Sequence, residues 1–290
     1  MAARLGIRPA KRLGQNFVID PGTIRRIVAL ADLGPQDVVL EVGPGLGSLT
    51  LGLVEVAGRV VAVEVDPVLA GELPRTVAAR APGLAGRLEV VSADALSLQA
   101  PPGRPPTALV ANLPYNVAVP VVLHMLDVMP SIRRALVMVQ SEVADRMCAQ
   151  PGSRTYGVPS VKLAWYATAR RAGTVSRSVF WPAPNVDSAL VALMRWPDRG
   201  APADTLAGPP GAGQRSLSRA AVFAVVDAAF AQRRKTLRSA LASWAGSAQA
   251  AEQFLRDAGV DPALRGEALG IDQYIRIALA ASRARTINES

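Results

Sequence analysis

The stretch that decides the fold is Glu41-Val42-Gly43-Pro44-Gly45-Leu46-Gly47. It follows an apolar run at residues 37–42 and precedes a helix-forming segment, which predicts a glycine-rich turn between a strand and a helix. Glycines there allow tight backbone angles and let a ligand approach the main chain. The spacing G-x-G-x-G differs from the G-x-G-x-x-G that cradles a pyrophosphate, and the acid Glu41 suits a sulfonium cation better than a phosphate. The loop therefore favours S-adenosylmethionine as cofactor.

Further apolar runs lie on the C-terminal side of this loop, at residues 59–65, 87–91, 107–111 and 135–139. Helix-length segments separate most of them. Strand–helix alternation with nearly continuous apolar strands is typical of a parallel sheet covered on both faces. Two more β-like runs are expected around residues 173–180 and 188–195. The predicted fold class is α/β, a Rossmann-like domain.

The composition changes after these strands. Residues 198–216 are rich in proline and glycine and predict a linker. Residues 217–285 are helix-forming, with Val222, Val225, Val226 and Phe230 at helical spacing. We therefore expect a Rossmann-like domain over 1–197, a linker over 198–216 and a small C-terminal α-helical domain over 217–290.

The chain of 290 residues has one cysteine, Cys148, and one histidine, His124. These exclude an internal disulfide, a cysteine zinc cluster and a histidine-rich metal site. No run reaches the roughly 18 apolar residues of a membrane span, and the first residues hold no apolar stretch long enough for a signal peptide. The sequence predicts a cytoplasmic protein without metal.

The formal net charge is +9. Such a charge is typical of proteins that bind nucleic acid, but three lysines against 29 arginines also fit the composition of a GC-rich genome. The clustering of basic residues favours the first interpretation, because clusters neutralise phosphates. The clusters are residues 4–26 with Lys11 and Arg12; Arg170, Arg171 and Arg177; and Arg233, Arg234 and Lys235 with Arg238.

Two acids follow the second and third predicted strands. Glu64 stands about 20 residues after the loop, where a carboxylate can accept both ribose hydroxyls. Asp94 is placed to accept from an adenine amino group. The carboxyl ends of parallel strands are where ligands bind in open sheets. The alternative is that both residues only form turns or cap helices.

Asn112-Leu113-Pro114-Tyr115 follows the fourth strand. The exocyclic amine of adenine is a poor nucleophile, because its lone pair is delocalised into the ring. The Asn112 oxygen and a backbone carbonyl near Pro114 can accept its hydrogens and turn the lone pair toward a methyl group. Tyr115 offers a face for stacking of a flipped base. The alternative is a proline-ended turn with a core tyrosine.

A second aromatic element, Phe180–Ser188, contains two prolines that stiffen the loop. We expect Phe180 to form the other half of a base clamp and Trp181 to be a hydrophobic anchor between strands. The alternative for Phe180 is the same anchoring role.

The chain resembles the bacterial small-subunit rRNA adenine dimethyltransferases (the KsgA/RsmA family) along nearly its whole length. The matching segments, in order, are 11–20, 41–47, 64–66, 94, 112–116, 140–144 with Arg146, 156–157, 180–188, and Phe230 with 233–237. Departures from the family pattern are a longer proline-rich loop between the third and fourth strands and the low-complexity residues 198–216.

The resemblance implies methylation of two adjacent adenosines near the 3′ end of 16S rRNA, two methyl groups on each, in the immature small ribosomal subunit. We also expect a monomer that binds no membrane. The implied cofactor residues are Asn16, Val18, Gly43, Gly45, Glu64, Asp94 and Asn112. The implied adenine-binding residues are Asn112, Leu113, Pro114, Tyr115 and Phe180. The implied rRNA-binding residues are Lys11, Arg12, Arg233, Arg234, Lys235 and Arg238, the last four on a basic C-terminal helix.

Three alternatives are left open. The first is a macrolide-resistance methyltransferase of large-subunit rRNA, in which Asn-Ile-Pro-Phe is usual in place of Asn112-Leu113-Pro114-Tyr115. The second is a non-catalytic RNA-binding assembly factor on the same fold, which an intact glycine loop disfavours. The third is a nicotinamide dehydrogenase, which the glycine spacing disfavours.

Overall fold

Seven strands form the main sheet of the structure, a computed structural model that describes residues 15–101, 103–114, 116–197 and 217–288. The strand order is β4-β3-β2-β5-β6-β9-β7. The first five of these strands are mutually parallel, and β9 is antiparallel to β6. Their bounds are β2 Val38–Val42, β3 Arg59–Glu64, β4 Leu88–Ser92, β5 Ala108–Asn112, β6 Arg134–Gln140, β7 Ala167–Val175 and β9 Ser188–Arg195. The five apolar runs therefore form the parallel strands that the sequence predicts.

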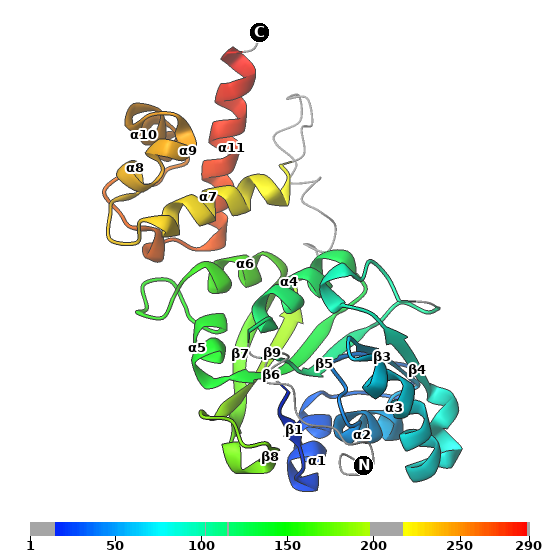
Figure 1. Cartoon of the computed structure of the whole chain (residues 1–290). Helices are drawn as coiled ribbons and strands as arrows, with labels where there is room; N and C mark the ends of the chain where they lie inside the picture. Colours follow the sequence, from blue (N-terminus) through cyan, green and yellow to red (C-terminus); the bar gives the residue numbers. More distant parts are fainter. Residues whose placement is uncertain (1–14, 102, 115, 198–216, 289–290) are drawn as a thin grey trace. The chain divides into compact units, whose positions relative to one another are not determined.

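Helices connect the parallel strands (Figure 1). Crossovers through α2 and α3 run from β2 to β3 and then to β4, whereas α4 connects β5 to β6 in the opposite direction along the sheet. Because such crossovers are right-handed, the two sets of helices cover opposite faces. The bounds are α1 Pro21–Leu30, α2 Ser48–Val56, α3 Pro67–Arg80, α4 Ala118–Val128 and α5 Ser141–Met147, with 3₁₀ turns at Pro82–Arg87 and Ala95–Ser97. Burial on both faces explains the continuous apolar strands: Val39, Leu40, Val60 and Val61 are fully buried.

The direction of the strand order reverses between β2 and β5, which pair with each other. Crevices at the carboxyl ends of strands on either side of such a reversal are the usual ligand sites of open α/β sheets. The glycine loop follows β2 at this position, and Asn112 is the last residue of β5.

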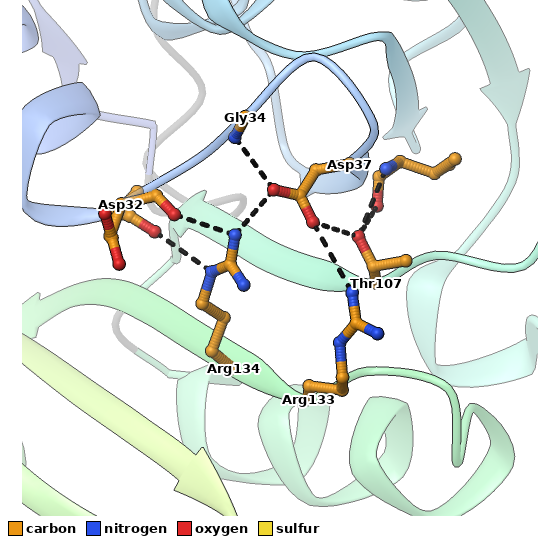
Figure 2. Close-up of polar contacts among 8 residues, drawn as sticks. Asp32, Gly34, Asp37, Thr107, Arg133 and Arg134 are labelled. Carbon is orange, nitrogen blue, oxygen red and sulfur yellow. Dashed lines mark hydrogen bonds and ion pairs between the residues drawn. The ribbon is translucent and has the colours of Figure 1, made fainter.

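At the amino ends of the same strands, Asp37 ties three of them together (Figure 2). Its carboxylate accepts hydrogen bonds from Arg134 Nη2 at 2.5 Å, Thr107 Oγ1 at 2.7 Å and Gly34 N at 2.8 Å. Arg133 lies 3.9 Å from it and is largely exposed. Asp37 precedes β2, Thr107 precedes β5 and Arg134 begins β6, so one buried acid fixes the starts of three neighbouring strands.

The strand predicted at residues 173–180 lies earlier in the chain than expected. The strand there is β7, which begins at Ala167 and ends at Val175. A 3₁₀ turn at Arg177–Val179 follows, and then the two-residue strand β8, Phe180–Trp181. β8 pairs antiparallel with β1, Phe17–Val18. The charged and half-exposed residues of β7 give it no apolar run, which is why the sequence placed the strand too late.

The second unit of the structure is helical (yellow to red in Figure 1, with α6 in green). It comprises α6 Val158–Tyr166, α7 Arg219–Ala231, α8 Leu237–Ala240, α9 Ala242–Ala245, α10 Ala248–Asp257, a 3₁₀ turn at Gly266–Ala268, and α11 Ile271–Asn288. Val222, Val225 and Val226 are fully buried on α7, as the helical spacing predicts. The hydroxyls of Tyr156 and Tyr274 donate to the Leu269 and Gly266 carbonyls, both at 2.8 Å, so each buried hydroxyl is satisfied.

The units divide the chain differently from the predicted ranges 1–197 and 217–290. The first contains residues up to Asp145 together with Thr168–Arg195, and the second contains Arg146–Ala167 together with residues from Trp196 onward. Helix α6 packs on α7 and α11, which assigns it to the helical unit. This packing is a long-range contact that composition does not reveal. The predicted linker, 198–216, lies outside the described residues.

Candidate active site

A cavity of about 240 Å³ lies at the carboxyl ends of β2, β3 and β5. The sequence-predicted cofactor residues come from five separate segments of the chain, and the structure brings all of them to this cavity: Asn16, Val18, Gly43, Gly45, Glu64, Asp94 and Asn112. The wall also includes residues that the sequence did not single out, among them Gln15, Phe17, Leu96, Val117 and Val121. Gln15 and Phe17 stand inside the matching segment 11–20 but have no predicted cofactor role, and Leu96, Val117 and Val121 belong to no motif, so the fold identifies all five as wall residues.

The glycine loop forms one wall with bare backbone. Gly43, Gly45 and Gly47 have φ angles of +70°, +56° and +84°, which L side chains rarely adopt. A Cβ on Gly45 would lie 2.7 Å from the Phe17 ring, and one on Gly47 would lie 2.6 Å from Leu73. Gly47 is the N-cap of α2. The loop therefore needs glycine for both conformation and space, as the sequence predicts.

Glu64 ends β3 and is buried, with 5% of its surface exposed. Its Oε2 accepts from Gly45 N at 3.1 Å and its Oε1 from Asp66 N at 3.0 Å. Burial raises the pKa of Glu64, and these two hydrogen bonds oppose the rise. The bonds fix the carboxylate in the cavity wall, where its remaining lone pairs can accept from two hydroxyl groups.

Asp94 also lines the cavity and stands between β4 and the next 3₁₀ turn. Its Oδ1 accepts from Leu96 N at 2.9 Å, so Asp94 caps that turn. The sequence left open whether Asp94 is a cap or a ligand-binding acid. The structure shows the cap and also places the residue at the cavity, where Oδ2 remains as an acceptor.

Asn112 occupies the end of β5, beside the glycine loop. Its Nδ2 donates to the Asn16 carbonyl at 2.9 Å. Because the amide nitrogen is used in this way, Oδ1 is the group that this side chain can offer to a donor in the cavity. The structure thus links two predicted site residues that are far apart in sequence.

The rest of the motif is only partly available for contact. Leu113 is 1% exposed as a whole residue, and because its side chain has no polar atom, any polar contact would use its backbone. The Pro114 carbonyl accepts from Val117 N at 3.2 Å, which leaves one lone pair. Tyr115 lies outside the described residues.

Phe180 is not at the cavity, which contradicts its predicted placement. Its side chain is 4% exposed and belongs to the hydrophobic core with Val18 and Leu190. The neighbouring Trp181 is 40% exposed and stacks on Phe17, with ring centroids 6.1 Å apart. The antiparallel pairing of β8 with β1 sets which of two consecutive side chains points inward. Phe180 is therefore the buried residue of the pair and Trp181 the exposed one, the reverse of what the sequence predicts, and neither lines the cavity.

Glu41 is the acid of the glycine loop and lies in β2 at the cavity wall, 1% exposed. Thr50 Oγ1 donates to its Oε2 at 2.7 Å. Its Oε1 has no hydrogen-bond partner among the described residues. Burial, together with the nearby charge of Glu64, raises the pKa of Glu41 to about 8, although the Thr50 hydrogen bond opposes the rise. A buried carboxyl of this kind fits a cationic ligand and disfavours a phosphate.

The predicted RNA-binding residues at the C-terminal side lie in the second unit. Arg233, Arg234 and Lys235 occupy the turn after α7, not a helix face, and all are exposed. Arg233 donates to Glu267 at 2.9 Å, and Arg238 donates to Glu252 at 2.7 Å. Lys11 and Arg12 lie outside the described residues.

Two absences apply to the described part of the chain. No group of three or more histidine, cysteine, aspartate or glutamate side chains there could hold a metal ion. None of its helices is both long enough and apolar enough to cross a bilayer. His124 lies with Nε2 2.8 Å from the Leu98 carbonyl.

The fold and the site define a Rossmann-like methyltransferase that uses S-adenosylmethionine. The features that carry this are the strand order, the G-x-G-x-G loop and the acid at the end of β3. The cavity wall also holds acids and no basic side chain among the described residues, which disfavours a phosphate ligand. Within that class, the chain belongs to the ribosomal RNA adenine dimethylase family, whose model matches residues 7–206.

The similarity of the chain to individual known proteins supports this assignment. The chain is 64% identical over 278 residues to the ribosomal RNA small subunit methyltransferase A of Thermobifida fusca, covering 96% of this chain and 92% of that one. A dimethyladenosine transferase from Plasmodium falciparum has the same fold, with a TM-score of 0.74, 21% identity, and coverage of 92% of this chain and 98% of that one. The 23S rRNA methyltransferase ErmE is similar at a TM-score of 0.60 and 26% identity, over 92% and 99% of the two chains.

Proposed function

We propose that the protein transfers methyl groups from S-adenosylmethionine to the exocyclic N6 of two adjacent adenosines near the 3′ end of 16S rRNA, forming N6,N6-dimethyladenosine. The single observation that carries the chemistry is the Asn112–Asn16 hydrogen bond at the cavity, because it leaves Asn112 Oδ1 as an acceptor for an N6 hydrogen. The name of the Thermobifida fusca relative, at 64% identity, favours small-subunit over large-subunit rRNA.

In this proposal, different cavity residues bind different parts of the cofactor. Glu64 accepts the ribose hydroxyls, and Asp94 accepts from the adenine amino group of the cofactor. The positive φ angles of Gly43 and Gly45 bring the backbone close to the methionine portion. Asn16, Val18 and Asn112 complete the wall. When bound, S-adenosylmethionine would supply the methyl group from its sulfonium, and the leaving group would be the neutral thioether of S-adenosylhomocysteine.

The protein contributes orientation in place of a strong base. Asn112 Oδ1 and the backbone carbonyl at Leu113 or Pro114 accept the two N6 hydrogens of the target adenine, which turns the nitrogen lone pair out of conjugation. Holding a nucleophile in this geometry lowers the activation barrier. Tyr115 would stack on the flipped base. The buried Phe180 keeps no such role.

The substrate context follows from charge. The exposed Arg234 and Lys235, with Lys11 and Arg12, would neutralise rRNA phosphates. We propose that the substrate is the immature small subunit, in the cytoplasm, and that the enzyme acts as a monomer.

The test is methylation of small subunits purified from a strain that lacks this activity. Wild-type protein with labelled S-adenosylmethionine should label 16S rRNA at two adjacent adenosines, and mass spectrometry of digested rRNA should find dimethyladenosine. Asn112→Ala should label 16S rRNA far more slowly than the wild type, whether or not its affinity for the cofactor falls. Label in 23S rRNA alone would support the macrolide-resistance activity instead, and cofactor binding without any labelling would support a non-catalytic factor.

A further inference from the structure

Glu41 holds a feature that the proposed chemistry does not use. Its carboxyl group is buried in the cavity wall, yet only one of its two oxygens is hydrogen-bonded among the described residues. Buried polar atoms are rarely left without a partner, and an ionised carboxylate in such a place is costly. The orphan Oε1 is therefore open to a donor or a positive charge from a ligand in the cavity, and without one the burial favours the protonated, neutral carboxyl group.

The described residues around Glu41 offer the cofactor-free protein no positively charged neighbour. From β3, the titratable group that acts on Glu41 is the acid Glu64, which makes ionisation harder. From α2, the contact is the neutral hydroxyl of Thr50. β5 contributes the uncharged Asn112, and the remaining titratable group among the described lining residues is another acid, Asp94. No lysine, arginine or histidine is among the described residues that line the cavity.

We propose that Glu41 carries a proton in the cofactor-free protein and releases it to solvent when the sulfonium cofactor binds, so that cofactor binding is coupled to the loss of one proton. This rests on the proposed assignment of the cavity to S-adenosylmethionine. The incoming positive charge takes the place of the proton, and the net charge of the site is conserved. The burial and the Glu64 charge that raise the pKa of Glu41 to about 8 keep the proton in place at neutral pH until then.

The coupling predicts discrimination between cofactor and product. S-adenosylhomocysteine has a neutral thioether where S-adenosylmethionine has a sulfonium. After methyl transfer, Glu41 therefore faces no positive sulfur and regains a proton from solvent. The product then binds without the charge interaction that favoured the cofactor, which assists its release.

The experiment is isothermal titration calorimetry of the full chain with S-adenosylmethionine at pH 7, in buffers that differ in ionisation enthalpy. The dependence of the heat on the buffer counts the protons released. A group with a pKa of about 8 is about nine-tenths protonated at pH 7, so we expect release of about 0.9 proton. Affinity should rise by up to about tenfold per pH unit below pH 8 and level off above it. S-adenosylhomocysteine should release far less.

Two variants provide the matched comparison. Glu41→Gln retains the shape and a partner for Thr50 but has no proton to release, so the buffer dependence should disappear. Subtracting its value also cancels protons that belong to the amino group of the ligand. Glu55→Gln, on the exposed side of α2, is the control and should behave as wild type. Equal proton release by wild type and Glu41→Gln overturns the proposal.

Infrared difference spectroscopy of the wild type keeps the proposal testable if Glu41→Gln does not fold. Adding S-adenosylmethionine should remove the C=O stretching band of a protonated carboxylic acid, and its persistence overturns the proposal. Cofactor binding with no proton release overturns this inference alone. An absence of binding by the wild type overturns the cofactor assignment and this inference together.

Discussion

Two buried acids at opposite ends of one strand have opposite surroundings. Asp37, directly before β2, is 7% exposed and is surrounded by donors: Arg134, Thr107, Gly34 and, more distantly, Arg133 (Figure 2). Glu41, four residues later, is 1% exposed and has one hydrogen bond among the described residues, from Thr50.

The pKa values of the two acids move in opposite directions as a result. Burial alone would raise the pKa of Asp37, but the hydrogen bonds from Thr107 and Gly34 and the charges of Arg134 and Arg133 outweigh it and hold the pKa below its ordinary value. Burial raises the pKa of Glu41 to about 8, because a single hydrogen bond does not offset it.

The different surroundings of Asp37 and Glu41 indicate that the two ends of the sheet serve different purposes, one stability and the other ligand binding. The amino end has its charges matched inside the protein, so it contributes to folding. The carboxyl end has acids and no matching cation among the described lining residues, which suits a site whose ligand supplies the charge. Substitutions at the two ends should therefore disturb different properties of the protein.

Replacing the matched acid should have the largest effect. Asp37→Asn leaves the mostly buried Arg134 without its counter-charge, and we expect a loss of about 3 kcal/mol in the free energy of unfolding, measured by urea denaturation. Arg133→Ala is the control, because its exposed side chain at 3.9 Å should contribute less than about 1 kcal/mol. Similar losses for the two variants would show that the network does not hold the strands.

An acid of the carboxyl end should affect binding instead. Glu64→Ala should weaken S-adenosylmethionine binding by about 1–3 kcal/mol, the cost of losing charge-assisted hydrogen bonds. This corresponds to roughly a 5- to 150-fold rise in Kd by calorimetry. The control is Glu55→Ala on exposed α2 surface, which should leave Kd unchanged. An unchanged Kd for Glu64→Ala would remove Glu64 from the cofactor site.

The stability of the cofactor-free protein should depend on pH through Glu41. Its folded pKa, about 8, lies above the ordinary 4.5, so the folded state binds more protons between these values. The contribution is fully present below about pH 4.5 and is lost as pH rises toward 8, by up to about 1.4 kcal/mol per pH unit. Asp37 acts in the opposite sense, because its lowered pKa contributes stability that is lost as pH falls through that pKa. Urea denaturation across this range should show a flatter profile for Glu41→Gln, and identical profiles would refute the assignment.

The basic residues of the helical unit should also differ according to whether their charge is paired inside the protein, but with smaller effects. Arg234→Glu with Lys235→Glu should weaken binding to small subunits and reduce the salt dependence, by a slope of roughly 0.7–0.9 for each phosphate that is no longer neutralised. Arg238→Glu is the comparison, because Arg238 already pairs with Glu252 inside the protein. Cofactor affinity should stay unchanged in all variants. A full salt slope in the double variant would make this turn an ordinary solvated surface.

The parts that the sequence predicts correctly are those set by local pattern. The apolar runs at β2, β3, β5 and β6 form strands that are buried on both faces, whereas β4 is a half-buried strand at the edge of the sheet. The glycine loop is confirmed because its conformation needs glycine at Gly43, Gly45 and Gly47.

The parts that depend on distant partners could not be read in this way. The inward side of Phe180 is set by pairing with β1, more than 160 residues earlier in the chain. The start of β7 is hidden because Arg170 and Arg171 interrupt its pattern. The state of the Glu41 carboxyl group depends on the hydrogen bond from Thr50 and on the charge of Glu64, and no local motif encodes these contacts.

The division between the two ends of the sheet is tested most directly by urea unfolding of Asp37→Asn and Glu64→Ala with and without S-adenosylmethionine. At a cofactor concentration of about 100 times Kd, the wild type should gain about 2.7 kcal/mol. Asp37→Asn should start well below the wild type and gain the same increment, whereas Glu64→Ala should gain much less than the wild type whatever its starting stability, because it also leaves the Gly45 and Asp66 amides without their acceptor. A missing increment in Asp37→Asn, or a full increment in Glu64→Ala, would show that the two ends do not divide stability and binding between them.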